Sequence, residues 1–376
     1  MIKFNVPVRA SSYDFLEEIE ASCKYSGDGP LTQKCHEWFD NHFKGAKTLF
    51  TTSCTHALEM MALLIDVKPG DEIILPSYTF VTSGSPFVAR GAKLIFVDIN
   101  PVTMNIDENK IEEAVTEKTK AILIVHYAGF SCDIDKVKEI TSKHGVFLLE
   151  DAAQALMSKY KGQSLGTFGD LSAFSFHETK NFHCGEGGLL VVNNLNLFKK
   201  AEMIREKGTD RASFLRGEVD KYTWQCLGSS YLPSEFNAGF LLDQLRRIEE
   251  LNSRRVDLWY KYKSLFNELG SYDGLTFCED LEYCSHNAHI FYIKLKNGLE
   301  RKSLRSYLLK KGIESASHYV PLHTSPAGIL YGDFFGSDKY TTKESERVLR
   351  LPMHTSLSDK DLVRVRDSVR DYFMEL

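Results

Sequence analysis

Short apolar runs alternate with segments of helical periodicity between about residues 50 and 250, and this alternation restricts the possible folds more than any other feature of the chain. The runs resemble strands and cover 72–75, 93–98, 121–125, 146–149, 173–176 and 189–192. Between them, residues 55–65, 105–115 and 133–142 place apolar side chains on one helical face. The alternation predicts an α/β domain whose mostly parallel sheet is covered by helices on both faces.

The pattern changes in the C-terminal third of the chain. Residues 241–262 predict one long helix rich in Arg and Glu, after which shorter strands and helices follow. We therefore expect an N-terminal arm over residues 1–30, a large domain over 31–250 and a smaller C-terminal α/β domain over 251–376. The arm is expected to pack either on the small domain or on a neighbouring subunit.

The charge balance and hydropathy exclude two classes of partner. Lys and Arg number 46 against 51 Asp and Glu, which gives a net charge of −5, and no long basic block occurs. We therefore expect no nucleic-acid partner. The apolar runs are far too short to span a membrane, and the first residues lack the apolar stretch of a signal peptide. These features predict a cytoplasmic protein without membrane contact.

The cysteines of the chain are scattered, and two of them lie close to two histidines. Eight cysteines are scattered without a CxxC pair, which favours free thiols in a reducing compartment. Cys278, Cys284, His286 and His289 are four possible ligands close together in the sequence. Zinc sites usually have closer cysteine pairs and a wider gap between the two halves. The spacing favours a loop that leads into a strand, and we expect no metal site.

Residues able to bind a phosphate or a charged ring follow two of the runs. Ligands of open α/β sheets bind beyond the carboxyl ends of the strands. Residues 51–55 place Ser and Thr where a helix begins, which suits either an N-cap or a bound phosphate. Glu150 and Asp151 end a run that should be buried. Asp151 is either a helix N-cap or the partner of a protonated ring nitrogen.

Lys180 follows the run at 173–176, in a loop bounded by Gly185, Gly187 and Gly188. A lysine in this position can be partly desolvated and act as an amine nucleophile, although a lone lysine is more often solvated surface. The helix start at 51–55, Asp151 and Lys180 are more informative in this order along the chain than any one of them alone. Pyridoxal phosphate chemistry needs a phosphate cup, a carboxylate and a lysine at one sheet edge.

In these segments the chain resembles the DegT/DnrJ/EryC1/StrS family of sugar aminotransferases, which are fold-type I pyridoxal phosphate enzymes. The resemblance covers nearly the whole chain. It is carried by 27–29 (GDG), 53–55 (SCT), 75–80 (LPSYTF), 150–154 (EDAAQ), 175–181 (SFHETKN) and 318–323 (HYVPLH). It implies a large domain with a mostly parallel mixed sheet and a smaller C-terminal α/β domain.

The resemblance also implies roles for residues around the cofactor. Lys180 corresponds to the Schiff-base lysine and proton shuttle, and Asp151 to the partner of the pyridine nitrogen. Gln154 is expected beside the ring hydroxyl. Phe80 either stacks on the pyridine ring or is a core aromatic. The phosphate is expected to be bound by the backbone of Cys54 and Thr55 and by the hydroxyls of Thr55 and Ser175.

Two departures from the family pattern affect the phosphate site. Much of the family has Gly at the Cys54 position, so a side chain must fit beside the phosphate loop. Many members contribute an Asn from the partner subunit where this chain has Ser230. If the Ser230 hydroxyl replaces that Asn, each active site needs two chains and the enzyme is an obligate homodimer.

The substrate side is expected to include basic and aromatic groups. Arg211, Arg216 and Lys221 lie in a polar loop that suits either a diphosphate or plain solvation. His318 and Tyr319 resemble the family's substrate segment in the small domain, and His318 is expected to face the sugar unless it is only hydrogen-bonded structure.

The implied activity is a ping-pong transamination. L-glutamate is expected as the amino donor and dTDP-4-keto-6-deoxyglucose as the acceptor, with surface polysaccharide synthesis as the purpose. The galacto product is expected from the branch of the family that the chain resembles, while the gluco epimer and a 3-amino isomer remain open.

Three rival functions fit these residues less well. The family's dehydratases have His in place of the lysine found at Lys180. A dehydrogenase of the Rossmann type needs a GxGxxG after its first strand, and none is present there. A cofactor-binding regulator without turnover predicts a broken catalytic set, but the set is intact.

Overall fold

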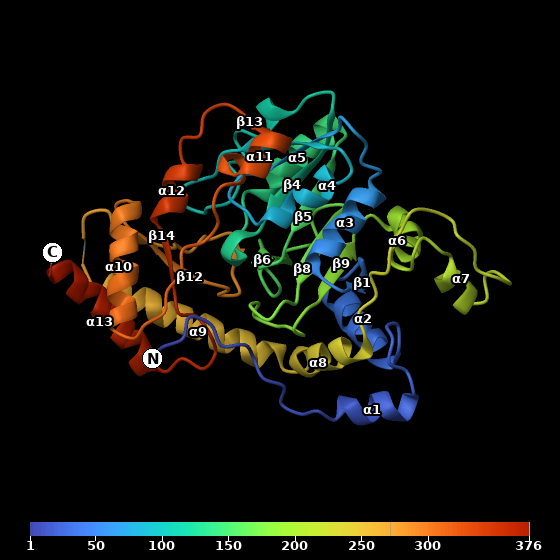
Figure 1. Ribbon diagram of the computed structural model, residues 1–376, viewed down its shortest axis with the longest axis horizontal. Helices are drawn as coiled ribbons and strands as arrows, with labels where there is room; N and C mark the ends of the chain where they lie inside the picture. Colours follow the sequence, from blue (N-terminus) through green and yellow to red (C-terminus); the bar gives the residue numbers. More distant parts are fainter. Residues whose placement is uncertain (271, 376) are drawn as a thin grey trace.

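An eight-stranded sheet forms the centre of the molecule in the computed structural model, which describes residues 1–270 and 272–375 (Figure 1). The strand order is β1-β9-β8-β5-β4-β2-β3-β13. Their bounds are β1 Lys47–Thr51, β2 Glu72–Pro76, β3 Lys93–Val97, β4 Thr119–Val125, β5 Phe147–Asp151, β8 Leu171–Ser175, β9 Gly188–Val192 and β13 Gly332–Phe334. β9 runs antiparallel to both of its neighbours, and the other strands are mutually parallel. The predicted mostly parallel sheet is confirmed.

Helices cover both faces of this sheet because alternate residues of each strand point to opposite sides. Ile122 and Ile124 of β4 share one core with the helices α2 (Pro30–His42), α5 (Ile134–His144) and α8 (Glu235–Leu245). Ala121 and Leu123 belong to the core on the other face, together with α3 (Cys54–Leu64), α4 (Ser85–Val88) and α6 (Phe198–Arg205). The inner strands of the sheet are therefore shielded from water on both sides, whereas the edge strand β13 is partly exposed.

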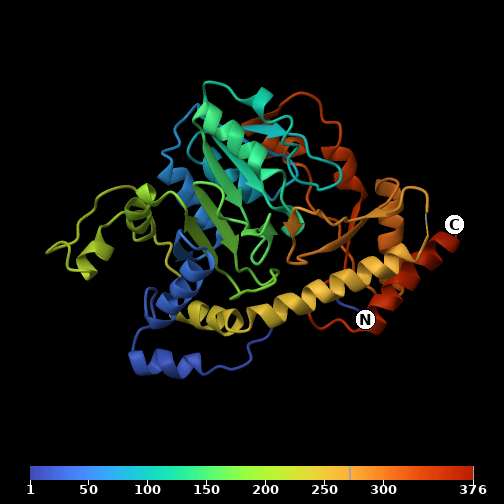
Figure 2. The same ribbon diagram turned by 180° about the vertical axis from the view of Figure 1, so that it is seen from behind.

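The C-terminal part of the chain forms a second core. Its sheet has the order β10-β12-β14, with β10 Thr276–Phe277, β12 Phe291–Lys294 and β14 Val348–Leu351. The long helix α9 (Ile248–Asn267) runs from the large sheet to this second core, as Figure 2 shows. Its buried face packs there beside α10 (Gly298–Lys310) and α13 (Asp359–Met374). The remaining elements are α1 (Phe15–Ser22), α7 (Arg211–Leu215), α11 (Pro326–Tyr331), α12 (Thr341–Arg347), β6 (Lys159–Tyr160), β7 (Gln163–Ser164) and β11 (Cys284–Ser285).

The structure divides the long helix expected over residues 241–262. α8 ends at Leu245 and α9 begins at Ile248, because Arg247 leaves the helical conformation with φ −125° and ψ 25°. The two helices have different packing partners, since α8 lies on α2 and α9 on α13. Periodicity alone did not reveal the break because both helices bury apolar residues at similar spacing.

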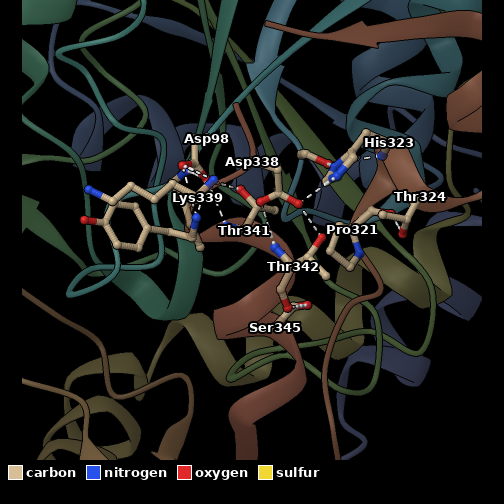
Figure 3. Close-up of polar contacts among 12 residues, drawn as sticks. Asp98, Pro321, His323, Thr324, Asp338, Lys339, Thr341, Thr342 and Ser345 are labelled. Carbon is tan, nitrogen blue, oxygen red and sulfur yellow. Dashed lines mark hydrogen bonds and ion pairs between the residues drawn. The ribbon is translucent and has the colours of Figure 1, made fainter. Parts of the chain in front are cut away.

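One segment of the C-terminal third returns to the large sheet. β13 pairs in parallel with β3, at the edge of the eight-stranded sheet. Asp98, which follows β3, accepts hydrogen bonds from the backbone N–H groups of Lys339 and Thr341 and from the Thr341 hydroxyl, as Figure 3 shows. His323 bridges Ser77 (Oγ to Nδ1, 2.6 Å) and Asp338 (Nε2 to Oδ2, 3.1 Å). These contacts hold the C-terminal segment against the large domain.

The first residues of the chain lie on the small domain and then cross to the large one. Ile2 pairs with Ile313, and the Phe4 N–H donates to Glu314 at 2.8 Å. Further along, the carbonyl of Val8 contacts His183 Nε2 at 2.8 Å. The arm therefore spans both domains of its own chain. In the described part of the chain, no helix has the length and apolar character needed to cross a membrane.

Candidate active site

A cavity of about 460 Å³ opens at the carboxyl edge of the large sheet, where the two domains and the arm meet. Its walls include residues that follow β1, β5 and β8, together with residues of the small domain. The lining side chains are Phe4, Asn5, Cys54, Thr55, Thr79, Phe80, Thr82, Val125, Asp151, Ala153, Gln154, Ser175, His177, Thr179, Lys180, Glu186, His289, Ile290, His318, Tyr319, Arg350, Leu351 and Met353. Most of the residues named from the sequence therefore meet at one place.

One wall of the cavity is the N-terminus of α3. Ser53 caps the helix by accepting a hydrogen bond from the His56 N–H at 3.1 Å. Cys54 and Thr55 begin the helix, so their N–H groups have no intrahelical acceptor, and both residues line the cavity. A Cβ at Gly188 of β9 would come within 2.4 Å of the Cys54 nitrogen. The glycine thus lets β9 pass directly under a helix start that suits an anion.

The side chain of Cys54 fits beside this helix start. It is buried in the same core as the rest of α3, which accounts for a residue larger than Gly at this position. Burial raises the pKa of the Cys54 thiol well above its ordinary value, so the group is neutral. The sulfur therefore adds no negative charge beside the helix N-terminus.

Asp151 is the last residue of β5 and is buried beside the cavity. Its carboxylate accepts hydrogen bonds from the Ser83 hydroxyl at 2.6 Å and from the Ala153 N–H at 3.1 Å. Both donors are neutral, so the negative charge of Asp151 is oriented but not neutralised. Turns follow the strand in place of a helix, and the N-cap interpretation of Asp151 is therefore wrong.

The adjacent Glu150 points to the other face of the sheet and has a different environment. It pairs with His126 Nε2 at 2.8 Å and accepts hydrogen bonds from the N–H groups of Gly166, Phe168 and Gly169. Burial would raise the pKa of Glu150, but His126 and the backbone donors lower it below its ordinary value. Glu150 therefore stabilises the turns after β5, while Asp151 faces the cavity.

Lys180 lines the same cavity, in the loop between β8 and β9. The loop is held by the hydrogen bond from Asn181 Nδ2 to the Asn287 carbonyl at 2.8 Å. Burial lowers the pKa of Lys180, and the charge of Arg350 acts in the same direction against the opposing effects of Cys54 and Asp151. A larger fraction of the amine is therefore neutral and able to act as a nucleophile or base.

Gln154, His318 and Tyr319 form a connected wall of the cavity. Gln154 accepts from the Ala128 N–H at 2.7 Å and donates to the Tyr319 hydroxyl at 2.8 Å. The His318 ring stacks on Tyr319 with centroids 3.8 Å apart, and its Nδ1 is 2.8 Å from the Tyr127 hydroxyl. Burial lowers the pKa of His318 well below its ordinary value, so the ring is neutral near pH 7.

Phe80 and Ser175 also reach the cavity. Phe80 is 52% exposed, which distinguishes it from a core aromatic, and its ring lies 6.0 Å from that of Tyr319. Ser175 ends β8 and lines the cavity from below the Lys180 loop. Both side chains can therefore contact a molecule bound between α3 and Lys180.

Four of the expected residues lie away from this cavity in their own chain, and the first of them, Arg211, pairs with Glu206. Arg216, Lys221 and Ser230 are exposed and belong to the segment 206–231, which projects from the large domain around α7 (Figure 1). Arg216 pairs with Glu202 and Glu218. One chain therefore does not bring these four groups to the cavity. Arg211, Arg216 and Lys221 lie in the part of the segment that extends outward, and Ser230 pairs with Glu206 at its base.

The structure adds residues that sequence reasoning did not assign to the site. Arg350 comes from β14, and Phe4 and Asn5 come from the arm. The sequence presents His289 only as a possible metal ligand, but its Nδ1 lies 2.9 Å from Asn181 Oδ1 and its side chain lines the cavity. No motif marked these positions, since their proximity to Lys180 arises only when the two domains pack together. Among the described residues, no cluster of His, Cys, Asp and Glu has the geometry of a metal site.

A helix start that suits an anion, a buried carboxylate and a desolvated lysine line one cavity. On a mostly parallel sheet with a second small domain, this arrangement defines the class of pyridoxal phosphate-dependent aminotransferases. The sequence model of the DegT/DnrJ/EryC1/StrS aminotransferase family matches residues 9–370 of this chain. The chain belongs to this family, whose members use pyridoxal phosphate.

Three known proteins illustrate the relationship. GDP-perosamine synthase from Escherichia coli O157:H7 is 30% identical over 368 residues, which covers 96% of this chain and 95% of that protein. The aminotransferase TlmJ from Streptoalloteichus hindustanus superimposes with a TM-score of 0.90 at 28% identity, over 100% of this chain and 99% of TlmJ. The sugar aminotransferase Spr1654 from Streptococcus pneumoniae, described as putative, has been solved in PLP and PMP forms, with TM-scores of 0.87 and 0.88 at 27% identity. In both forms the match covers 100% of this chain, with 100% of Spr1654 covered in the PMP form and 99% in the PLP form.

Proposed function

We propose that this sugar aminotransferase transfers the amino group of L-glutamate to C4 of dTDP-4-keto-6-deoxy-D-glucose. The products are dTDP-4-amino-4,6-dideoxy-D-galactose and 2-oxoglutarate, for surface polysaccharide synthesis in the cytoplasm. The observation that carries the proposal is the placement of Lys180 and Asp151 on one cavity with the start of α3. The nucleotide and the position of the amine rest on the resemblance of the sequence, and the experiment below tests them separately.

The residues of the cavity fit the cofactor. The N–H groups of Cys54 and Thr55 and the Ser175 hydroxyl suit its phosphate, and the Asp151 carboxylate suits a protonated ring nitrogen. Gln154 suits a hydrogen bond with the ring hydroxyl, and Phe80 suits a stacking contact on one ring face. When bound, pyridoxal phosphate supplies a cationic ring that accepts the electron pair released at the reacting carbon. Asp151 favours that cationic form.

Lys180 supplies the proton transfers at the reacting carbons. In its unprotonated form, which the lowered pKa favours, Nζ takes the proton from the α-carbon of glutamate in the first half-reaction. It returns a proton to the sugar carbon in the second. The α-carbon is oxidised to a ketone while the sugar carbonyl is reduced to an amine. The two half-reactions therefore balance without any outside oxidant or reductant.

The segment 206–231 supports a homodimer with shared active sites. It projects from its own chain and exposes apolar side chains, including Leu215 (62%), Trp224 (76%) and Leu227 (59%). Exposed apolar groups of this kind suit burial against a second copy. In the proposed dimer, Ser230 contacts the phosphate in the partner's site, and Arg216 and Lys221 meet the diphosphate of the nucleotide sugar.

Absorption spectroscopy and product analysis test the proposal in two stages. The purified protein is mixed with pyridoxal phosphate and then with L-glutamate, and the visible band of the bound cofactor should disappear. The dTDP-keto sugar is then added, and the product is identified by NMR, in which an axial 4-amine gives the galacto product. An equatorial 4-amine or a 3-amine would replace the galacto assignment. A band that does not respond to any amino acid would contradict the transaminase proposal itself.

A further inference from the structure

Arg350 is a basic residue of the cavity to which the proposal above gives no role. It lies on β14 of the small domain, and its side chain lines the same cavity as Lys180. The Phe4 ring of the arm lies 4.8 Å from the guanidinium carbon. In the described chain, the only hydrogen bond of this guanidinium goes from Nη2 to the Ser317 carbonyl at 3.3 Å. Its Nε is buried without a partner.

This environment of the half-buried Arg350 differs from that of the buried Arg205 and Arg255. Arg205 forms a bidentate pair with Asp28, with distances of 2.6 and 2.7 Å. Arg255 donates to the carbonyls of Ala288 and His289. Arg350 has no carboxylate partner among the described residues, although a partly buried guanidinium is costly unless its charge is balanced. Its donors therefore suit an anion that enters the cavity.

The cavity offers few other cations for such an anion. Among its described lining residues, Lys and Arg occur only at Lys180 and Arg350. Burial lowers the pKa of both His289 and His318 well below the ordinary value, so both rings are neutral. His177 lies 3.6 Å from Glu186. Because Lys180 is committed to proton transfer, Arg350 is the permanent positive charge of the cavity.

We propose that Arg350 binds the α-carboxylate of the amino donor. The inference rests on the proposed function, because transamination requires the α-carbon of an amino acid to approach Lys180. The α-carboxylate is attached directly to that carbon and must enter the same cavity. A guanidinium presents paired donors that match a carboxylate, and the Phe4 ring restricts its plane. The arm and the small domain thereby help to select an amino acid as donor.

Measuring the two half-reactions separately distinguishes binding of the donor carboxylate from binding of the nucleotide sugar. The variants Arg350→Met and Arg350→Lys are compared with Arg370→Met, which changes an exposed arginine of α13 outside the cavity. Glutamate-dependent loss of the cofactor band is measured in single turnover, and the amination of the dTDP-keto sugar is measured separately from the PMP form. We expect Arg350→Met to raise the glutamate concentration for half-maximal rate by roughly 10- to 150-fold, as for lost hydrogen bonds to a charged group. For Arg350→Lys this glutamate concentration should lie between those of the wild type and Arg350→Met. Lysine keeps the positive charge but lacks the paired N–H donors of a guanidinium.

A donor without the α-carboxylate provides the decisive comparison. L-isoglutamine carries an amide in place of that carboxylate, so the wild type and Arg370→Met should strongly prefer glutamate. Arg350→Met should lose most of this preference, whereas a general structural defect would slow both donors equally. Thermal unfolding of each variant shows whether it is folded.

Two results would overturn the inference. An unchanged preference for glutamate in Arg350→Met would exclude contact with the α-carboxylate. A defect confined to the sugar half-reaction would assign Arg350 to the diphosphate of the nucleotide sugar. If the wild type itself converts no amino acid, the proposed function fails. If the wild type is active and Arg350→Met is equally active with glutamate, only the role of Arg350 fails.

Discussion

At the residue scale, Glu150 and Asp151 show how neighbouring positions on one strand acquire different roles. Successive strand residues face opposite sides of a sheet, so the two carboxylates enter different environments. Glu150 meets His126 and three backbone N–H groups, whereas Asp151 meets neutral donors and the cavity. Only Asp151 keeps a charge available to a ligand.

Asp151→Asn should therefore slow transamination while the cofactor remains bound. An amide keeps the shape of the side chain but cannot favour a cationic ring, so we expect kcat to fall by roughly 10²-fold or more. Steady-state kinetics and cofactor content measure the two effects. Ser83→Ala is the milder comparison, since it removes one donor to Asp151 and leaves the charge in place. A near-normal rate in Asp151→Asn would reduce Asp151 to a structural residue.

Lys180→Ala should abolish turnover because no other lysine lines the cavity in the described chain. We expect the rate to fall at least about 10³-fold, in line with the loss of a general base. Product formation by chromatography measures the rate, and circular dichroism checks the fold. Lys161→Ala, at an exposed ion pair with Asp135, is the matched control and should retain activity. Turnover retained in Lys180→Ala would mean that the catalytic lysine is a different one.

At the scale of elements, the turn that precedes α12 depends on one carboxylate of the large domain. Asp98 accepts hydrogen bonds from the N–H groups of Lys339 and Thr341 (Figure 3). It also accepts one from the Tyr340 N–H and pairs with Lys110 at 3.2 Å. α12 leads directly into β14, which carries Arg350. Asp98 thereby ties the position of one cavity wall to the edge of the large sheet.

Asp98→Ala should destabilise the protein by about 3 kcal/mol, because several buried donors lose their acceptor together. Thermal unfolding at pH 7 measures the change. Asp333→Ala serves as a control, since its ion pair with Lys93 is exposed and should contribute little. An equal effect of the two substitutions would show that Asp98 does not hold the turn.

The same residue predicts a dependence of stability on pH. Burial would raise the pKa of Asp98, but the hydroxyl and N–H of Thr341 and other donors lower it below its ordinary value. The unfolded state then binds the proton more readily, so the stabilisation is complete above the ordinary aspartate pKa and is lost as the pH falls through the lower folded value. The difference in melting temperature between the wild type and Asp98→Ala should shrink toward acidic pH. A difference independent of pH would contradict this account.

At the scale of the whole molecule, the cavity exists because three parts of the chain meet. The large domain provides Lys180 and Asp151, the small domain provides His318 and Arg350, and the arm provides Phe4. No residue of the segment 206–231 lines this cavity, and the segment projects from the large domain around α7 (Figures 1 and 2). The geometry of one chain therefore explains the chemistry at the cofactor but leaves the proposed diphosphate contacts to a partner.

Subunit mixing tests the proposed shared site. Lys180→Ala is mixed under dissociating conditions with a variant that carries Arg216→Ala, Lys221→Ala and Ser230→Ala. Each is expected to have little activity alone, but a mixed dimer contains one site with both wild-type contributions. Random exchange should restore about a quarter of wild-type activity, since half of the dimers are mixed and each has one intact site. No recovery, with exchange confirmed by mass spectrometry, would show that each site is built from one chain.

Local pattern was sufficient for the fold class and for the residues at strand ends. The alternation of apolar runs predicted the parallel sheet and the covering helices near 55–65 and 133–142, because side-chain periodicity reflects burial directly. The helix expected over 105–115 was wrong, since that segment forms turns and a single 3-10 turn at Glu112–Ala114. Lys180, Asp151 and Cys54 were recognisable because parallel strands bring their carboxyl ends to one edge. Their side chains needed no distant contact to reach the cavity.

Tertiary structure alone decided the rest of the site. Arg350, Phe4 and His289 carry no local signal, and they reach Lys180 only through the packing of the small domain and the arm. The break between α8 and α9 and the return of β13 to the large sheet were likewise set by packing partners far away in the sequence. Periodicity reports which side of an element is buried, whereas the partner that buries it depends on contacts between distant segments of the chain.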